Sequence, residues 1–205
     1  VLLYPDDERE IGELATQPFV ADYLQDLIEQ DRVLAAKVAR AEHVLISRLD
    51  AASTTCLGTD RSRTYTVLYD HAAYAQRQAQ MWWNVLARAH RLEWLSQVRM
   101  RPCVTGEDDR AHEGYDLAYE WTPFSFFDRP EAIHRRVQQL AGQLSPGAVA
   151  FIVGPPVVAE SCRAAGLQLQ AMTPVASLPT FRMHQSVLPR AQLKPGIMLY
   201  QIVRR

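Results

Sequence analysis

Glycine is scarce near the start of this chain, and its scarcity excludes several common kinds of ligand site. The sequence has nine glycines in 205 residues, with none between Gly12 and Gly58. Loops that bind phosphate need closely spaced glycines, because their backbone must approach the ligand without an intervening Cβ. No phosphate loop is present, and neither a nucleophile elbow nor a paired catalytic carboxylate motif is found.

Cysteine and histidine are too scattered to indicate a disulfide framework or a metal centre. Cys56, Cys103 and Cys162 are odd in number and form no paired pattern, which favours a reducing compartment and hence a cytoplasmic location. The six histidines include no pair one helical turn apart, so we expect no metal site.

Long hydrophobic runs are also missing. No apolar stretch approaches the roughly 20 residues that a membrane span needs, and nothing resembles a signal peptide. The chain begins at Val1 rather than Met, so a leader or upstream domain stays open. We expect a globular chain with no membrane span.

Neither sign of charge is in excess. Lys and Arg number 22 and Asp and Glu 23, for a formal net charge of −1. Because no overall field attracts nucleic acid, we expect no nucleic-acid partner. The charges are unevenly distributed, with acids dominating residues 6–31 and arginine dominating residues 129–205. Two oppositely charged faces exposed to solvent explain this distribution. The alternative is that the acidic and basic ends of the chain dock against each other, or that one of them docks to a protein partner.

Residues 114–153 carry continuous signals for a strand, a helix and a second strand. The short, mostly apolar run 115–121 is ended by Thr122-Pro123. For the helix, Asp128 is the expected N-cap, with Pro130 in the first turn and Glu131 completing a capping box.

An apolar stripe predicts how this helix packs. The stripe consists of Ile133, Val137, Leu140, Ala141 and Leu144, and the polar residues 134–136 and 138–139 fall elsewhere. Ser145-Pro146-Gly147 stops the helix, and the apolar run 148–153 is typical of a strand buried on both faces. The product is a βαβ unit with parallel strands.

The remaining elements complete a chain of one α/β domain with N-terminal helices. Residues 1–42 are expected to form a helical cap, with helices over 6–16 and 19–41, on an α/β domain over 43–205. The other predicted strands are 43–47, 65–70, 92–98, 167–172 and 197–203, and the other predicted helices are 72–89 and 157–165. No helix fits between the last two strands, so we expect them to be antiparallel neighbours.

This order resembles that of the class I S-adenosylmethionine-dependent methyltransferases, which have a Rossmann-like sheet of seven strands. The best matching residues are Tyr115-Asp116-Leu117-Ala118, Leu144-Ser145-Pro146-Gly147-Ala148 and the terminal run Ile197 to Val203. In that family an Asp-Leu pair opens the fourth strand, a Leu-x-Pro-Gly-Gly turn precedes the fifth, and a reversed strand closes the chain. The resemblance covers roughly residues 44–205 and implies a three-layer, mostly parallel sheet with a reversed C-terminal strand.

The resemblance also implies a cofactor, S-adenosylmethionine, and places residues around it. Asp70 matches the family's acid after the second strand, which binds the ribose hydroxyls, and a carboxylate suits paired O–H donors. The family's Gly-x-Gly loop after the first strand is degenerate here, reading Arg48-Leu49-Asp50-Ala51-Ala52-Ser53. Asp50 is assigned to the ammonium group of the cofactor, and Ser53 lies in the same loop.

Residues at the end of the fourth predicted strand are the candidates for catalysis. Glu120 is assigned as general base and cofactor contact, and Trp121 as an aromatic side chain that stacks on the substrate. The alternative without a catalytic role is that Glu120 is a loop acid beside a core tryptophan. Methyl transfer to a small-molecule substrate is the leading function. The alternative is a pseudoenzyme that keeps the fold, has lost the glycine loop and serves as a structural or regulatory subunit. The oligomeric state stays open.

Overall fold

The structure is a computed structural model, and it describes residues 27–47, 63–69, 87, 96–102, 114–121, 129–179 and 196–205. The predicted helices 6–16 and 72–89 lie outside these ranges, except for the helical residue Ala87. The described elements are α3 (Arg32–Arg40), β1 (His43–Ser47), β2 (Thr64–Tyr69), β3 (Val98–Pro102), β4 (Tyr115–Trp121), α5 (Pro130–Gln143), β5 (Leu144–Gly154), α6 (Val157–Ala164), β6 (Leu167–Pro174), the 3-10 helix η5 (Val175–Ser177) and β7 (Met198–Arg204).

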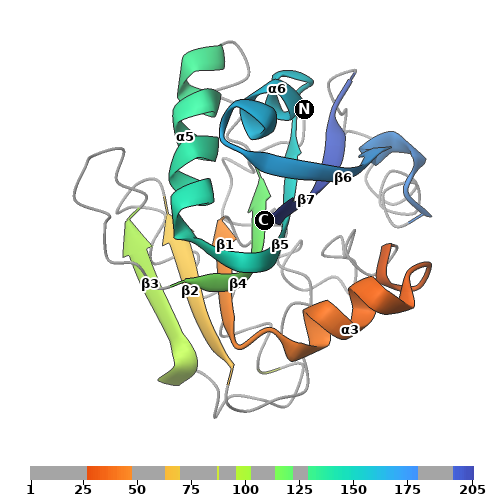
Figure 1. The fold of residues 1–205 in the computed structure, drawn as a ribbon. Coiled ribbons are helices and arrows are strands. Elements are labelled where there is room, and N and C mark those ends of the chain that lie inside the picture. The colour runs from red at the N-terminus through yellow and green to blue at the C-terminus, as the bar shows by residue number, and fades with distance from the viewer. Residues whose placement is uncertain are drawn as a thin grey trace.

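Seven of these elements form a single mixed sheet (Figure 1). Its strand order is β3-β2-β1-β4-β5-β7-β6. The first five strands are parallel to their neighbours, whereas β7 runs antiparallel to both β5 and β6. The predicted fold class, including the reversed last strand and the antiparallel final pair, is therefore confirmed.

The sheet centre is buried on both faces because its strands are continuously apolar. Along β5 every residue from Ala148 to Gly154 is buried, and three successive residues of β1, Val44 to Ile46, are at most 1% exposed. Successive side chains of a strand point to opposite faces, so burial of consecutive residues requires a cover on each side. This pattern is the one predicted for the strand over 148–153.

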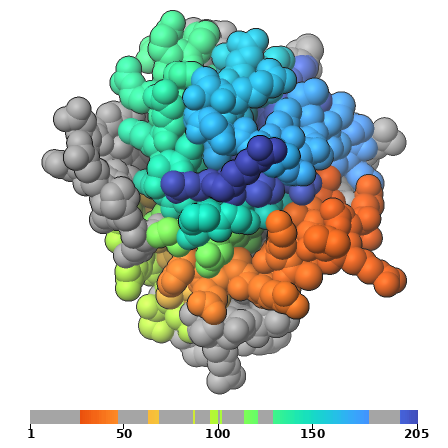
Figure 2. All heavy atoms as spheres, in the orientation of Figure 1, coloured from red at the N-terminus to blue at the C-terminus, as the bar shows by residue number. Residues whose placement is uncertain are grey.

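Helices α5 and α6 cover one face of the sheet. The stripe Ile133, Val137 and Leu140 of α5 packs in one core cluster with Val158 and Cys162 of α6 and with alternate strand residues. In Figure 2 the atoms of α5, α6, β6 and the end of β7 form one continuous surface on the face shown. The predicted role of the stripe is confirmed for its members on α5, but Leu144 and the expected stop Ser145-Pro146-Gly147 belong to β5, because α5 ends at Gln143.

The start of α5 differs from the prediction. The N-cap is Arg129, which makes no capping hydrogen bond through its side chain, and Pro130 is the first helical residue. The predicted N-cap Asp128 lies outside the described residues. The prediction was one residue early because it put Pro130 second in the helix, whereas the fixed φ and missing N–H of proline favour the first helical position.

The N-terminal helix is interrupted rather than continuous as predicted. A single helix over 19–41 was expected, but the chain turns at Glu29 and Gln30 and α3 begins at Arg32. Asp31 causes the break, because its carboxylate accepts hydrogen bonds from the backbone N–H groups of Val33 and Leu34. Residues before 27 lie outside the described ranges.

Two buried features hold α3 in place. Leu34 and Val38 are 2% and 3% exposed. Nη2 of Arg63, a fully buried side chain just before β2, donates hydrogen bonds of 2.8 Å to the carbonyl oxygens of Val38 and Ala39. A cation suits the negative end of the helix dipole at these last carbonyls.

The third predicted strand is wrong in position. We expected residues 92–98, whereas β3 begins at Val98 and continues through Arg99 and Arg101 to Pro102. Among the described strands, β3 pairs only with β2 and forms one edge of the sheet. Edge strands accept charged side chains and a final proline, which sequence periodicity reads as a strand end.

Candidate functional site

The parallel strands end along one side of the sheet, which we call the carboxyl edge. The register places Leu68, Ser47, Glu120 and Ile152 side by side across β2, β1, β4 and β5 near this edge. The strand order reverses between β1 and β4. In open α/β sheets, ligands bind outside the carboxyl ends of the strands at such a reversal.

Three of the predicted cofactor residues lie outside the described part of the chain. Asp50 and Ser53 follow the last residue of β1 in sequence, and Asp70 follows the last residue of β2. Their roles therefore stay predictions. Trp121 is the last residue of β4 and pairs with Val153 of β5, but its side chain is not among the described ones.

Glu120 is the predicted site residue that the structure describes in full. It is the penultimate residue of β4 and is 4% exposed. Nε of Arg136, on α5, donates a hydrogen bond of 2.8 Å to Oε1 of Glu120. The side chain of Glu120 is 5% exposed and that of Arg136 is 8% exposed. A buried carboxylate of this kind is stable only when a cation and hydrogen bonds offset its lost hydration.

The second carboxylate oxygen of Glu120 is in a different situation. Oε2 is shielded from solvent and accepts no hydrogen bond from the described residues. A buried carboxylate oxygen without a donor is costly, because the ionised group keeps several acceptor positions that water would otherwise fill. Oε2 therefore requires a donor from outside the described residues, such as a water molecule or a ligand.

Cys162 of α6 and Tyr200 of β7 lie in the same core cluster. Burial raises the pKa of the Cys162 thiol to about 12, and the negative charge of Glu120 adds to the rise while Arg163 opposes it. Burial also raises the pKa of Tyr200 to about 12, and its hydroxyl donates a hydrogen bond of 3.0 Å to the carbonyl oxygen of Pro155. Both groups are neutral at physiological pH, so neither is a ready nucleophile.

Sequence reasoning missed Arg136. The helix prediction placed it away from the apolar stripe, yet it is 7% exposed and is one of the buried residues of α5. Its spacing could have revealed it, because Arg136 follows Ile133 by three residues and precedes Leu140 by four, which puts all three on one helix face. Its charge argued for solvent, and its partner Glu120 is 16 residues away in sequence.

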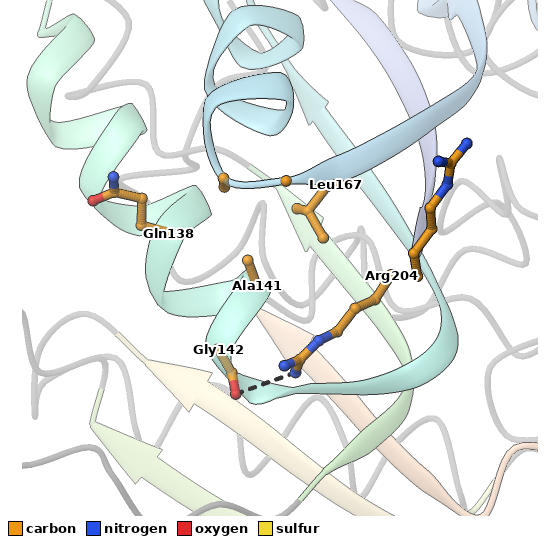
Figure 3. Close-up of a pocket in the computed structure, with 8 residues that line it drawn as sticks. Gln138, Ala141, Gly142, Leu167 and Arg204 are labelled. Atoms are coloured by element: carbon orange, nitrogen blue, oxygen red, sulfur yellow. Dashed lines mark hydrogen bonds between the residues drawn. The ribbon is translucent and has the colours of Figure 1, made fainter.

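A separate cavity lies at the opposite end of the sheet (Figure 3). It has a volume of about 330 Å³, and its lining residues are Gln138, Ala141, Gly142, Ala165, Gly166, Leu167, Arg204 and Arg205. The guanidinium of Arg204 donates to the carbonyl oxygens of Gly142 and Leu144, where α5 ends and β5 begins. This cavity is at the amino end of β5, away from the carboxyl edge, and Arg204 there caps the C-terminus of α5.

Within the described ranges, no group of three or more His, Cys, Asp and Glu side chains is placed to hold a metal ion. Among the described helices, none has the length and apolar character that a bilayer crossing requires.

Comparison with known proteins gives structural matches but no sequence matches. No family model matches the chain, and no curated protein matches its sequence. The structure resembles a SAM-dependent methyltransferase from Aquifex aeolicus, with a TM-score of 0.57 and 12% identity over 97% of this chain and 99% of that one. It also resembles a geranyl diphosphate methyltransferase in complex with SAM, with a TM-score of 0.57 and 11% identity over 98% and 92%.

Another protein with a similar fold is named for a different reaction. The [4+2]-cyclase SpnF has a TM-score of 0.58 and 15% identity over 90% of this chain and 80% of that one. At these identities the matches show the fold, which is the Rossmann-like sheet of class I SAM-dependent methyltransferases. Since one fold supports several reactions, the activity must be argued from the site itself.

Proposed function

We propose that this chain binds S-adenosylmethionine at the carboxyl edge and transfers its methyl group to a small-molecule acceptor. The supporting observation is the Glu120 carboxylate, buried beside the strand-order reversal with one oxygen that accepts no hydrogen bond from described residues. An anionic acceptor in a shielded position fits a cofactor with ammonium and hydroxyl donors. The class I methyltransferase fold agrees with this proposal.

The proposed contacts follow the strand ends. Asp70 accepts hydrogen bonds from the two ribose hydroxyls, Asp50 binds the ammonium group, and Ser53 lies in the same loop as Asp50. Small residues, including Ala51 and Ala52, leave room in a loop that lacks the family's glycines. This degenerate loop is the weakest match to the family, and measured affinity tests it directly.

The cofactor supplies an electrophilic methyl group, and the chain's own residues orient the acceptor and accept its proton. Glu120 is the proposed base and Trp121 the proposed wall against which the acceptor stacks. The ion pair with Arg136 fixes one oxygen of the Glu120 carboxylate and leaves the other as a possible acceptor for a ligand donor.

Calorimetric titration tests the proposal. The chain is titrated with S-adenosylmethionine and S-adenosylhomocysteine, and its melting temperature is recorded with and without each ligand. Saturable heat and a rise in melting temperature are the expected results, since a ligand that binds the folded state stabilises it. Absence of both at millimolar ligand would overturn cofactor binding and leave the pseudoenzyme with a structural or regulatory role.

Three further assignments are kept as proposals. Residues 1–42 form a helical cap on the α/β domain over 43–205, which is supported by the contacts of Arg63 with the end of α3. A cytoplasmic location is supported by the free thiol of the buried Cys162. The partner is a small-molecule substrate, and association with a protein partner or a second copy is tested by measuring the mass of the chain in solution.

A further inference from the structure

The Glu120–Arg136 pair joins a strand to a helix at the site edge. Glu120 lies one residue before the end of β4, and Arg136 lies in the second turn of α5. Both side chains are more than nine-tenths buried. A single hydrogen bond is recorded between them, from Nε of Arg136 to Oε1 of Glu120.

The hydrogen bond from Arg136 involves only Oε1 of the Glu120 carboxylate. Fixing Oε1 on α5 restricts the rotation of the Glu120 side chain, and Oε2 then occupies one defined position. In that position it meets no hydrogen-bond donor from the part of the chain that is described. The neighbouring Ala118 and Ile152, which lie on the same face of the sheet, are apolar and offer no donor from their side chains.

The Glu120 carboxylate also acts on the Cys162 thiol of α6. Burial is the main cause of the raised pKa of that thiol, and the negative charge of Glu120 adds to the rise. Apolar residues of similar volume replace a buried ion pair without loss of stability in several proteins. Stability alone thus gives no reason for a charged pair at this place.

We propose that Arg136 is a positioning residue for the ligand site, which holds Glu120 so that Oε2 accepts a hydrogen bond from an N–H or O–H donor of the bound ligand. The inference rests on the proposed function, because the ligand in question is the one at the carboxyl edge. It assigns the ligand a chemical class, a small molecule with an ammonium, amine or hydroxyl group near the end of β4.

Titration of paired variants with S-adenosylhomocysteine, which carries an ammonium group and ribose hydroxyls, tests this role. The single variant Arg136→Met leaves a buried carboxylate without its cation and is expected to bind about 10- to 100-fold more weakly, with a lower melting temperature. Arg136→Lys keeps a cation near Oε1 and is expected to recover part of the affinity. Arg135→Met is the matched control, because Arg135 is exposed on the same helix, and it is expected to bind like the unchanged chain.

The double variant Glu120→Leu with Arg136→Met separates a positioning role from a structural one. Its apolar pair is expected to restore the melting temperature while affinity stays at least about tenfold reduced, because the acceptor Oε2 is gone. Recovery of full affinity together with stability would overturn the positioning role, because the ligand would then bind without the acceptor Oε2. The unchanged chain distinguishes this failure from failure of the proposed function. If it binds no S-adenosylhomocysteine at all, the proposed function fails; if it binds and the double variant binds equally well, only the positioning role fails.

Discussion

The carboxylate of Asp116 accepts a hydrogen bond of 3.1 Å from the backbone N–H of His43. The same oxygen, Oδ2, accepts a second bond of 3.1 Å from the N–H of Glu42. Asp116 is near the start of β4 and His43 is the first residue of β1, so this contact ties together the two strands between which the sheet order reverses. The Asp-Leu pair that opens the fourth strand therefore has a structural use at the end opposite the carboxyl edge.

Replacing Asp116 tests this use. Asp116→Ala removes an acceptor shared by two backbone donors and is expected to lower the free energy of unfolding by about 1–2 kcal/mol, as measured by urea denaturation. Asp116→Asn keeps an oxygen at the same place and is expected to lose less than half of that. Equal stability of all three chains would show that water replaces the carboxylate without cost.

Replacement of Asp70 tests the proposed cofactor site directly. This residue lies outside the described ranges. Asp70→Ala is expected to weaken S-adenosylhomocysteine binding by about 10-fold or more, because it removes a charged acceptor for ribose hydroxyls. The melting temperature without ligand is expected to change little. Asp31→Asn, at the cap of α3, is the control and should leave the titration unchanged. Unaltered affinity of the Asp70 variant would remove this residue from the site.

Truncation of Phe151 tests how much packing of the central strand β5 contributes to the stability of the fold. It is fully buried in β5, between β4 and β7. Phe151→Ala is expected to lower the free energy of unfolding by about 3–5 kcal/mol, through lost apolar burial and the cavity that remains. Val33→Ala is the control, since Val33 is 70% exposed and its truncation should change stability by no more than about 0.5 kcal/mol. A small effect at Phe151 would contradict the dense packing of this strand.

Local sequence patterns predicted the buried strands best. The bounds 43–47 and 115–121 agree with β1 and β4, and Gly166 ends the turn after α6 with a φ of +73°. These segments are predictable because continuous apolar runs and a left-handed glycine are local features. Strand β3 was misplaced because its charged residues are tolerated at an edge that only the assembled sheet defines.

The candidate site was less accessible to sequence reasoning. Glu120 was identified from its place at a strand end, but its partner Arg136 was only placed away from the apolar stripe, because burial of an arginine depends on a contact between separate elements. The sequence also suggested one base, whereas the structure shows a carboxylate with one oxygen bound to Arg136 and the other accepting no hydrogen bond from the described residues. The roles of Asp50, Ser53 and Asp70 remain predictions that binding measurements decide.

Alkaline pH is expected to destabilise the chain through Cys162 and Tyr200. Burial raises the pKa of the thiol from 9.0 to about 12 and that of the phenol from 10.0 to about 12. In the folded state both groups keep their protons in a range where the unfolded chain releases them. The stabilisation is complete below pH 9 and is lost as pH rises toward 12.

The expected slope can be measured on single variants. One proton corresponds to about 1.4 kcal/mol of unfolding free energy per pH unit, so the loss begins above about pH 9 with Cys162 and steepens above about pH 10 with Tyr200. Urea denaturation at about pH 8, 9.5 and 10.5 measures it. Cys162→Ala should flatten the decline that starts near the lower pH, and Tyr200→Phe the added part at higher pH, although the latter also loses its bond to Pro155. The same decline in the unchanged chain and in both variants would show that other groups govern alkaline unfolding.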